Sequence, residues 1–353
     1  MHVASLDPVR LLSILAAIAV VIVGADPRAA RGKTTDITAV LDLDVGLAQN
    51  VEQPKRNIWQ GIGQAGIVQL HQGHVQGLLT RYPTGTSGGS AAQLAIRFAR
   101  LRSAIASTQA FDTAGCATTP ARIATWFELD SPETLAAAPE EVPSWTARGI
   151  RVFALAGKLD SPLASSAFPS GPERAVGLTA VGRRVAETIM RTGALVDVAN
   201  LSDLAILEVL DLARQLGTPV IDTRASSRAV RARPGSLSDA QIRAVVQTGG
   251  VVALTLDRDA IGDGAQAELS DVVRQLQHLS RVAGPDAVAL ASGFETGSLP
   301  PMALSSASRF PRLVEALIAS GMPDETVRKI FRANALRVLC GHDATSPGRG
   351  HGG

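Results

Sequence analysis

The stretch RTGALVDVANLSDLAILEVLDLARQLGTPVIDTR, residues 191–224, decides the fold. Residues 194–199 form a short apolar run, residues 201–216 carry apolar side chains at helical spacing, and residues 218–221 form a second short apolar run. This order predicts a strand, a helix and a second strand. Two strands that are apolar throughout and are joined by a covering helix are typical of a parallel sheet buried on both faces.

The same alternation continues along the rest of the chain. Further strands are expected at residues 37–43, 123–129, 150–156, 251–256 and 287–291, and helices at residues 91–105, 132–148, 182–192, 237–249, 268–283, 311–320 and 323–339. Residues 65–70 form another apolar run, and residues 82–90 and 158–176, rich in Gly, Ser and Pro, are expected to be loops. Such alternation predicts one closed (β/α)8 barrel of the TIM type, which commonly takes about 250 residues or more.

The composition excludes one class of partner. Apolar residues make up 46% of the 353 residues, charged residues 19%, and the net charge is only +2 at pH 7. Proteins that bind nucleic acid usually carry a strongly basic patch, so the charge balance gives no support for a nucleic-acid partner. The length and the apolar share are sufficient for the core of one large domain.

The N-terminus is typical of an export signal. Arg10 precedes an uncharged apolar run at residues 11–25, and small residues end this run where a signal peptidase would cleave. The run is shorter than the roughly 20 residues that span a membrane, so a cleaved signal peptide at residues 1–25 is favoured over a permanent anchor. We therefore expect an exported protein of the bacterial periplasm or cell envelope, with a membrane contact only if this segment stays uncleaved.

The remaining chain divides into three parts. Residues 26–36 are expected to form a linker, residues 37–340 the barrel, and residues 341–353 a disordered tail. The two cysteines, Cys116 and Cys340, could pair in an oxidising compartment or remain two separate thiols, because the sequence does not supply the distance between them.

Several segments resemble the membrane dipeptidase (renal dipeptidase) family of zinc metallopeptidases. The resemblance rests on GLTAVGRRVAETIMRTGALVDVANLS, residues 177–202, and TPVIDTRASSRAV, residues 218–230, and its landmarks run in order from residue 37 to residue 339. It implies a metallo-dependent-hydrolase-like barrel in which two zinc ions at the mouth hold a bridging hydroxide that attacks a dipeptide.

The resemblance maps the family's zinc ligands onto degenerate positions. In place of the expected His, Asp and Glu ligands stand Asp44 and Gly46 after the first strand, Glu128 or Asp130 after the third, Asn200 and Arg224 in the central unit, and Gly293 near the end of the barrel. A carboxamide oxygen is a poor zinc ligand, and a guanidinium is a permanent cation that only donates hydrogen bonds. We therefore expect the binuclear zinc site and the dipeptidase activity to be lost, and we predict no cofactor.

Other positions suggest how the carboxyl-terminal end of the barrel could bind a ligand without zinc. We expect Arg224 to pair with nearby carboxylates in place of the metal. Gly157 stands where the family has a histidine thought to polarise the substrate, and Arg233 loosely matches an expected arginine. Arg224, Arg233 and Gly157 are thus candidate ligand-binding residues.

These observations lead to a main hypothesis and an alternative. The main hypothesis is a pseudoenzyme of hydrolase fold that binds a small peptide or acts as a scaffold, as a homodimer or in a hetero-oligomer with an active paralogue. The alternative is an active metallodipeptidase with a rebuilt or single-metal site, using Asp44, Glu128 or Asp130 and His71, which lies three residues before His74.

Overall fold

The computed structural model describes residues 39–47, 63–83, 90–113, 115–117, 121–168 and 177–341. The predicted signal peptide, the predicted linker and the predicted tail after residue 341 lie outside these residues. Among the described helices, none is both long and apolar enough to cross a membrane.

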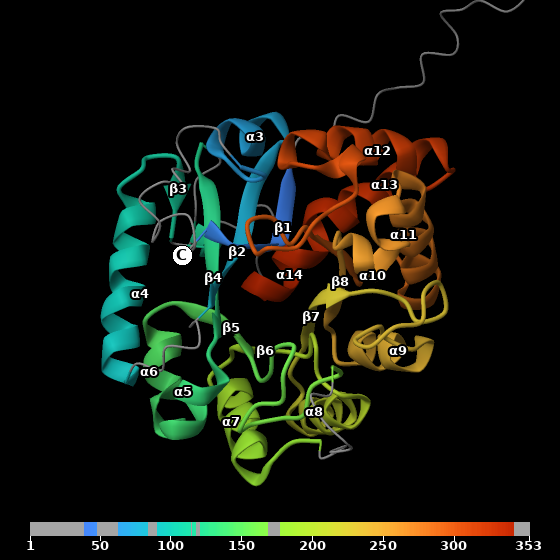
Figure 1. Ribbon diagram of the computed structural model, residues 1–353. Coiled ribbons are helices and arrows are strands. Elements are labelled where there is room, and N and C mark those ends of the chain that lie inside the picture. Colours follow the sequence, from blue (N-terminus) through green and yellow to red (C-terminus); the bar gives the residue numbers. More distant parts are fainter. Residues whose placement is uncertain are drawn as a thin grey trace, which may run out of the picture. The chain divides into compact units, whose positions relative to one another are not determined.

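Parallel strands in the described part of the chain close into a barrel of eight (Figure 1). Each strand pairs with its neighbour in the barrel, and β2 closes the ring by pairing with β4. The barrel strands are β1 (Val40–Val45), β2 (Val75–Pro83), β4 (Ile123–Asp130), β5 (Ile150–Ala154), β6 (Leu195–Asp197), β7 (Ile221–Ala225), β8 (Val251–Thr255) and β9 (Val288–Ala291). A two-residue strand, β3 (Phe111–Asp112), pairs in parallel with the start of β4. The predicted single (β/α)8 barrel is confirmed.

Helices surround the barrel strands, and all except α14, which lies at one end of the barrel, are on the outside (Figure 1). They are α3 (Ile67–Gln72), α4 (Ala91–Ala106), α5 (Pro132–Ala137), α6 (Val142–Ala147), α7 (Ala180–Arg191), α8 (Asp203–Leu216), α9 (Asp239–Gln247), α10 (Arg258–Ile261), α11 (Leu269–Ala283), α12 (Phe310–Ala319), α13 (Asp324–Arg328) and α14 (Asn334–Cys340). In the central unit, Ser202 caps the amino end of α8, and Gly217 ends the helix in a left-handed conformation with φ of 65°.

One predicted loop and one predicted helix differ from the structure. Residues 82–83 belong to β2 rather than to the loop predicted at residues 82–90, and the whole strand β2 was not predicted. The helix expected at residues 132–148 is two short helices, because Pro139 and Pro143 lack the N–H that a continuous helix needs.

Two strands lie later in the sequence than predicted. The first strand covers residues 40–45 instead of 37–43, so Asp42 and Asp44 lie within it. The strand expected at residues 218–221 begins only at Ile221, which places Thr223 and Arg224 inside β7 rather than beyond it. Both shifts carry polar residues into the barrel wall near its carboxyl end, called the mouth below.

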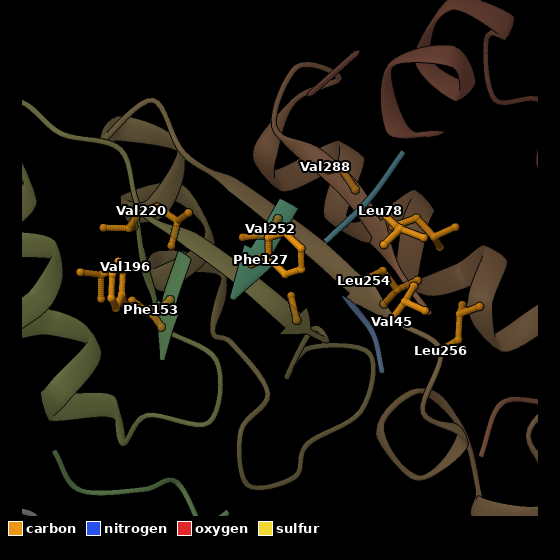
Figure 2. Close-up of a cluster of buried hydrophobic side chains, with 14 of the residues drawn as sticks. Val45, Leu78, Phe127, Phe153, Val196, Val220, Val252, Leu254, Leu256 and Val288 are labelled. Carbon is orange, nitrogen blue, oxygen red and sulfur yellow. The ribbon is translucent and has the colours of Figure 1, made fainter. Parts of the chain in front are cut away.

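Strand β4 shows how the barrel wall is built. Ile123, Phe127 and Leu129 belong to the large apolar cluster between the strands and the helices, part of which is shown in Figure 2. Ala124 and Trp126 belong to a second cluster inside the barrel. Because side chains alternate along a strand, the inner face continues to residues 128 and 130, where it becomes acidic. The barrel interior is therefore apolar toward the amino-terminal ends of the strands and charged at the mouth.

The last helix closes the amino-terminal end of the barrel. Val338 and Leu339 of α14 pack into the inner apolar cluster. Arg337 donates from Nη1 to the carbonyl of Gly249 at 2.6 Å and from Nη2 to that of Asp286 at 3.0 Å, and both carbonyls precede strands. Arg151 at the start of β5 donates in turn to the carbonyls of α14. The helix therefore forms the floor of the barrel.

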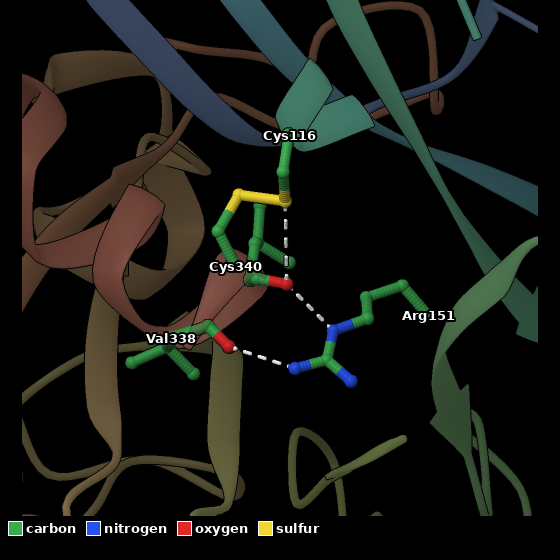
Figure 3. Close-up of a disulfide and its surroundings, with 5 residues drawn as sticks. Cys116, Arg151, Val338 and Cys340 are labelled. Atoms are coloured by element: carbon green, nitrogen blue, oxygen red, sulfur yellow. Dashed lines mark hydrogen bonds between the residues drawn. A yellow bond between two sulfur atoms is a disulfide. The ribbon is translucent and has the colours of Figure 1, made fainter. Parts of the chain in front are cut away.

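A disulfide between Cys116 and Cys340 ties this floor to the wall (Figure 3). The Cα atoms lie 5.6 Å apart, and Cys116 belongs to a short 3-10 turn that packs on β4 and α14. Arg151 lies beside the disulfide, with Nε donating to the carbonyl of Leu339 at 2.7 Å and Nη2 to that of Val338 at 3.1 Å. Of the two alternatives for the cysteines, the structure has the pair.

Candidate functional site

The mouth contains an ion pair between Asp44 of β1 and Arg81 of β2. Nη2 of Arg81 lies 2.5 and 2.6 Å from the two carboxylate oxygens of Asp44, which is buried. Nη1 of Arg81 lies 3.9 Å from Asp130 of β4. Arg81 was not among the residues singled out from the sequence, because its strand was not predicted. Gly77, Arg81 and Pro83 interrupt the apolar pattern of this stretch and weaken its strand signal.

Arg224 of β7 lies among three buried carboxylates. Its Nε is 3.4 Å from Asp44, its Nη2 is 3.5 Å from Glu128, and its Nη1 is 3.8 Å from Asp197. Burial alone would lower the pKa of this guanidinium, but the attraction of Asp44, Glu128 and Asp197 outweighs it and raises the pKa above its usual value. Arg224 is therefore a permanent cation at the mouth.

Asp197 is fixed in place by the neighbouring strand. Its carboxylate accepts hydrogen bonds from the backbone N–H of Thr223 at 3.0 Å, from the hydroxyl of Thr223 at 2.6 Å and from the N–H of Ala199 at 3.0 Å. These bonds join the ends of β6 and β7. They hold the acid that faces Arg224 in one orientation.

Glu128 and two further buried carboxyl groups, those of Asp42 and Asp222, have raised pKa values. Burial raises the pKa of Asp42 from 3.8 to about 7, although hydrogen bonds from Ser292 and Asp44 oppose the shift. Burial, together with Asp197, raises the pKa of Asp222 to about 7. Burial also raises the pKa of Glu128 well above its usual value, although Arg224 opposes this. Burial thus favours the protonated form of these three groups, which reduces the negative charge near Arg224.

Two of the predicted ligand positions have no room for a larger side chain. A Cβ atom on Gly46 would lie 2.5 Å from the carbonyl oxygen of Glu295, so the backbone after β9 occupies the space of a side chain. Gly293 has φ of 71°, and a Cβ there would lie 3.0 Å from Ser298. A zinc-binding aspartate at Gly46 would require the backbone to move, and one at Gly293 would crowd the Ser298 side chain and hold a left-handed φ.

A cavity of about 440 Å³ opens above the charged cluster. Residues expected from the sequence to bind metal or ligand lie along its wall together with Arg81: Asp130, Gly157, Asn200, Arg224 and Arg233. Asn200 has φ of 63°, a left-handed conformation that asparagine tolerates. The cavity therefore brings together residues from β2, β4 and the segments after β5, β6 and β7.

Two other groups lie apart from this cavity. His71 and His74 are exposed at the end of α3 and just before β2, and His74 precedes the residue that pairs with Val40 at the start of β1. Asp44 lies four residues further along β1, roughly 13 Å from Val40 at the rise of a strand, so the structure places His71 and Asp44 at different levels of the barrel. The carboxylate of Glu295, just after β9, accepts a hydrogen bond from the backbone N–H of Ala65 at 3.0 Å.

The residues at the mouth do not fit a zinc pair. Zinc needs imidazole, thiolate or carboxylate donors around an open position. Within the described residues, no group of three or more His, Cys, Asp or Glu side chains is arranged to hold a metal ion. Asp44, Glu128 and Asp197 instead face the guanidinium of Arg224 within 3.8 Å. The positive charge of Arg224 would repel a zinc ion in the same space.

The family model described as membrane dipeptidase (peptidase family M19) matches residues 35–346. The chain belongs to the membrane dipeptidase family. An uncharacterized Klebsiella pneumoniae protein from the pqqA 5′ region is 31% identical over 179 residues, which is 50% of this chain and 65% of that protein. Human dipeptidase 3 is 28% identical over 163 residues, which is 46% of this chain and 33% of that protein. The matches thus span less than two thirds of these relatives.

A solved metallopeptidase structure has the same fold. It is a metallopeptidase from Rhodobacter sphaeroides liganded with a phosphinate mimic of the dipeptide L-Ala-D-Ala. The two structures agree with a TM-score of 0.73 at 18% sequence identity, over 85% of this chain and 98% of that one. At this identity the similarity shows the fold, and the residues at the mouth must be considered on their own chemistry.

Proposed function

We propose that this member of the membrane dipeptidase family is a pseudoenzyme that binds a small peptide or amino-acid-like ligand at the barrel mouth and does not perform binuclear zinc hydrolysis. The observation that carries the proposal is the position of Arg224 among Asp44, Glu128 and Asp197. Two guanidiniums, with Arg81 as the second, supply positive charge to carboxylates that would otherwise face metal ions.

The cavity supports the binding part of the proposal. Its volume of about 440 Å³ lies in the range of small-molecule sites, and its wall carries both cationic and acidic side chains, among them Arg233, Asp257 and Asp259. A dipeptide is a zwitterion and needs both kinds of partner. The bound dipeptide mimic in the Rhodobacter relative is consistent with such a ligand.

The setting and assembly of the protein are part of the same proposal. The N-terminal apolar run supports an exported protein of the bacterial periplasm or cell envelope. A pseudoenzyme could act alone, as a homodimer, or as a structural partner of an active paralogue. Co-purification of a zinc-dependent paralogue with the chain would favour the last of these.

Metal content tests the proposal directly. The purified chain is incubated with excess zinc, desalted and subjected to elemental analysis, beside Asp44→Ala and Arg224→His. We expect far less than one equivalent of zinc in the parent and a gain in Arg224→His, which replaces the central cation by a ligand. Arg214→His, on the exposed face of α8, controls for zinc bound by an added surface histidine.

The alternative activity predicts a different result. One or two equivalents of zinc in the parent, lost in Asp44→Ala, would overturn the proposal and favour a metallodipeptidase with a rebuilt site. Hydrolysis of dipeptides, followed with and without added zinc, would then be the decisive assay.

A further inference from the structure

Two cations on the cavity wall differ from Arg81 and Arg224. Lys158, directly after Gly157, and Arg233, in the segment after β7, both line the cavity. Among the described residues, neither has a carboxylate within ion-pair distance, whereas Arg81 and Arg224 each have at least two. Their positive charge is available to a ligand.

The guanidinium of Arg233 packs against an aromatic ring, but one of its nitrogens lacks a hydrogen-bond acceptor. Its guanidinium carbon lies 5.6 Å from the ring centroid of Phe168, which supports the flat face of the group. Its Nη1 is buried and has no hydrogen-bond acceptor in the described part of the chain. A buried donor without an acceptor is costly, so a turn of the guanidinium that brings this N–H group to a ligand oxygen in the cavity would be stabilising.

Space for a ligand group lies beside Lys158. A Cβ atom added to Gly157 would meet no other atom within 4 Å. The neighbouring ammonium is exposed at the rim of the cavity. The wall between β5 and β7 therefore combines free volume with two positive charges that lack an internal partner.

We propose that Lys158 and Arg233 form a two-cation subsite that selects peptides carrying an acidic side chain beside their terminal carboxylate. This inference rests on the proposed function, because it names the class of peptide that the mouth binds. The planar guanidinium suits one carboxylate through paired N–H donors, and the lysine ammonium suits the second negative charge.

Matched dipeptides test the subsite. Isothermal titration compares Ala-Glu with Ala-Gln, which has nearly the same shape but one negative charge fewer. We expect the parent to bind Ala-Glu roughly tenfold more tightly than Ala-Gln, the size of one charge-assisted contact. Lys158→Gln should remove most of this preference. Arg100→Gln, which deletes one positive charge from the exposed face of α4, should retain it.

The outcomes separate this inference from the proposed function. Equal affinities for the two peptides, or a preference that survives in Lys158→Gln, would overturn the subsite and leave peptide binding in place. A preference lost equally in Arg100→Gln would also overturn it, since only net charge would then matter. Absence of binding for both peptides would overturn the proposed function and the subsite together.

Discussion

The two ends of the barrel use the same side chain for different purposes. At the floor, Arg151 and Arg337 donate to neutral backbone carbonyls of α14 and of segments that precede strands. At the mouth, Arg81 and Arg224 lie against carboxylates. Burial lowers the pKa of Arg151, whereas neighbouring acids outweigh burial and raise the pKa of Arg224. Arginine thus secures packing at one end and neutralises charge at the other.

This contrast predicts different responses to the loss of one guanidinium. Arg224→Met leaves Asp44, Glu128 and Asp197 facing one another, so we expect unfolding free energy to fall by about 4 kcal/mol at pH 8 and by less at pH 5, where more protons are bound. Arg151→Met removes hydrogen bonds to carbonyls and should cost about 2 kcal/mol at either pH. Urea titrations measure both. Equal losses of unfolding free energy in the two variants, with no dependence on pH, would contradict the different roles of arginine at the mouth and the floor.

The disulfide stabilises the floor and has no part in the mouth. We expect the double variant Cys116→Ala/Cys340→Ala to lose about 3 kcal/mol of unfolding free energy, because the cross-link no longer restrains the unfolded chain. Affinity for a bound peptide, measured by titration below the melting temperature, should stay at the parental value. A large loss of affinity in this variant would mean that the floor and the mouth are coupled.

Asp42, whose carboxyl group is buried in the barrel wall, provides the expected effect that depends most clearly on pH. Its folded pKa of about 7 exceeds the ordinary 3.8, so the native state keeps a proton that the unfolded state releases. Stability from this group is therefore present below pH 4 and lost as the pH rises toward 7. Asp42→Asn should match the parent near pH 4 and exceed it by about 4 kcal/mol at pH 8, since each pKa unit between 3.8 and 7 corresponds to about 1.4 kcal/mol. A constant difference across this range would contradict the assigned pKa.

The sequence predicts the barrel better than it predicts the mouth. The apolar runs around Ala194 to Ile221 have a period and order that allow little besides a parallel sheet with covering helices. Strand β2 was missed because Gly77, Arg81 and Pro83 interrupt its apolar pattern, and with it the partner of Asp44 was missed. Whether carboxylates point at a cation or at backbone N–H groups depends on packing, as Glu295 shows.

Asn200 and Arg224 illustrate how much of the site's chemistry follows from residue type alone. Their chemistry argues against zinc wherever they lie, and the structure adds that Arg224 reaches Asp44, Glu128 and Asp197 at once. The pairing of Cys116 with Cys340 could not be predicted, because it requires the last helix to reach the start of β4 across 224 positions of chain. Such contacts depend on how the barrel closes.

The cross-link also makes strands β4 to β9 part of one covalent ring. A protease that cuts an exposed loop inside this ring, for example near Ala232 and Pro234 after β7, would leave both fragments attached to each other. The nicked chain would migrate as one species until a reductant is added. In a protease-rich compartment, such a chain could sustain cleavage beside its cavity and still remain a single molecule.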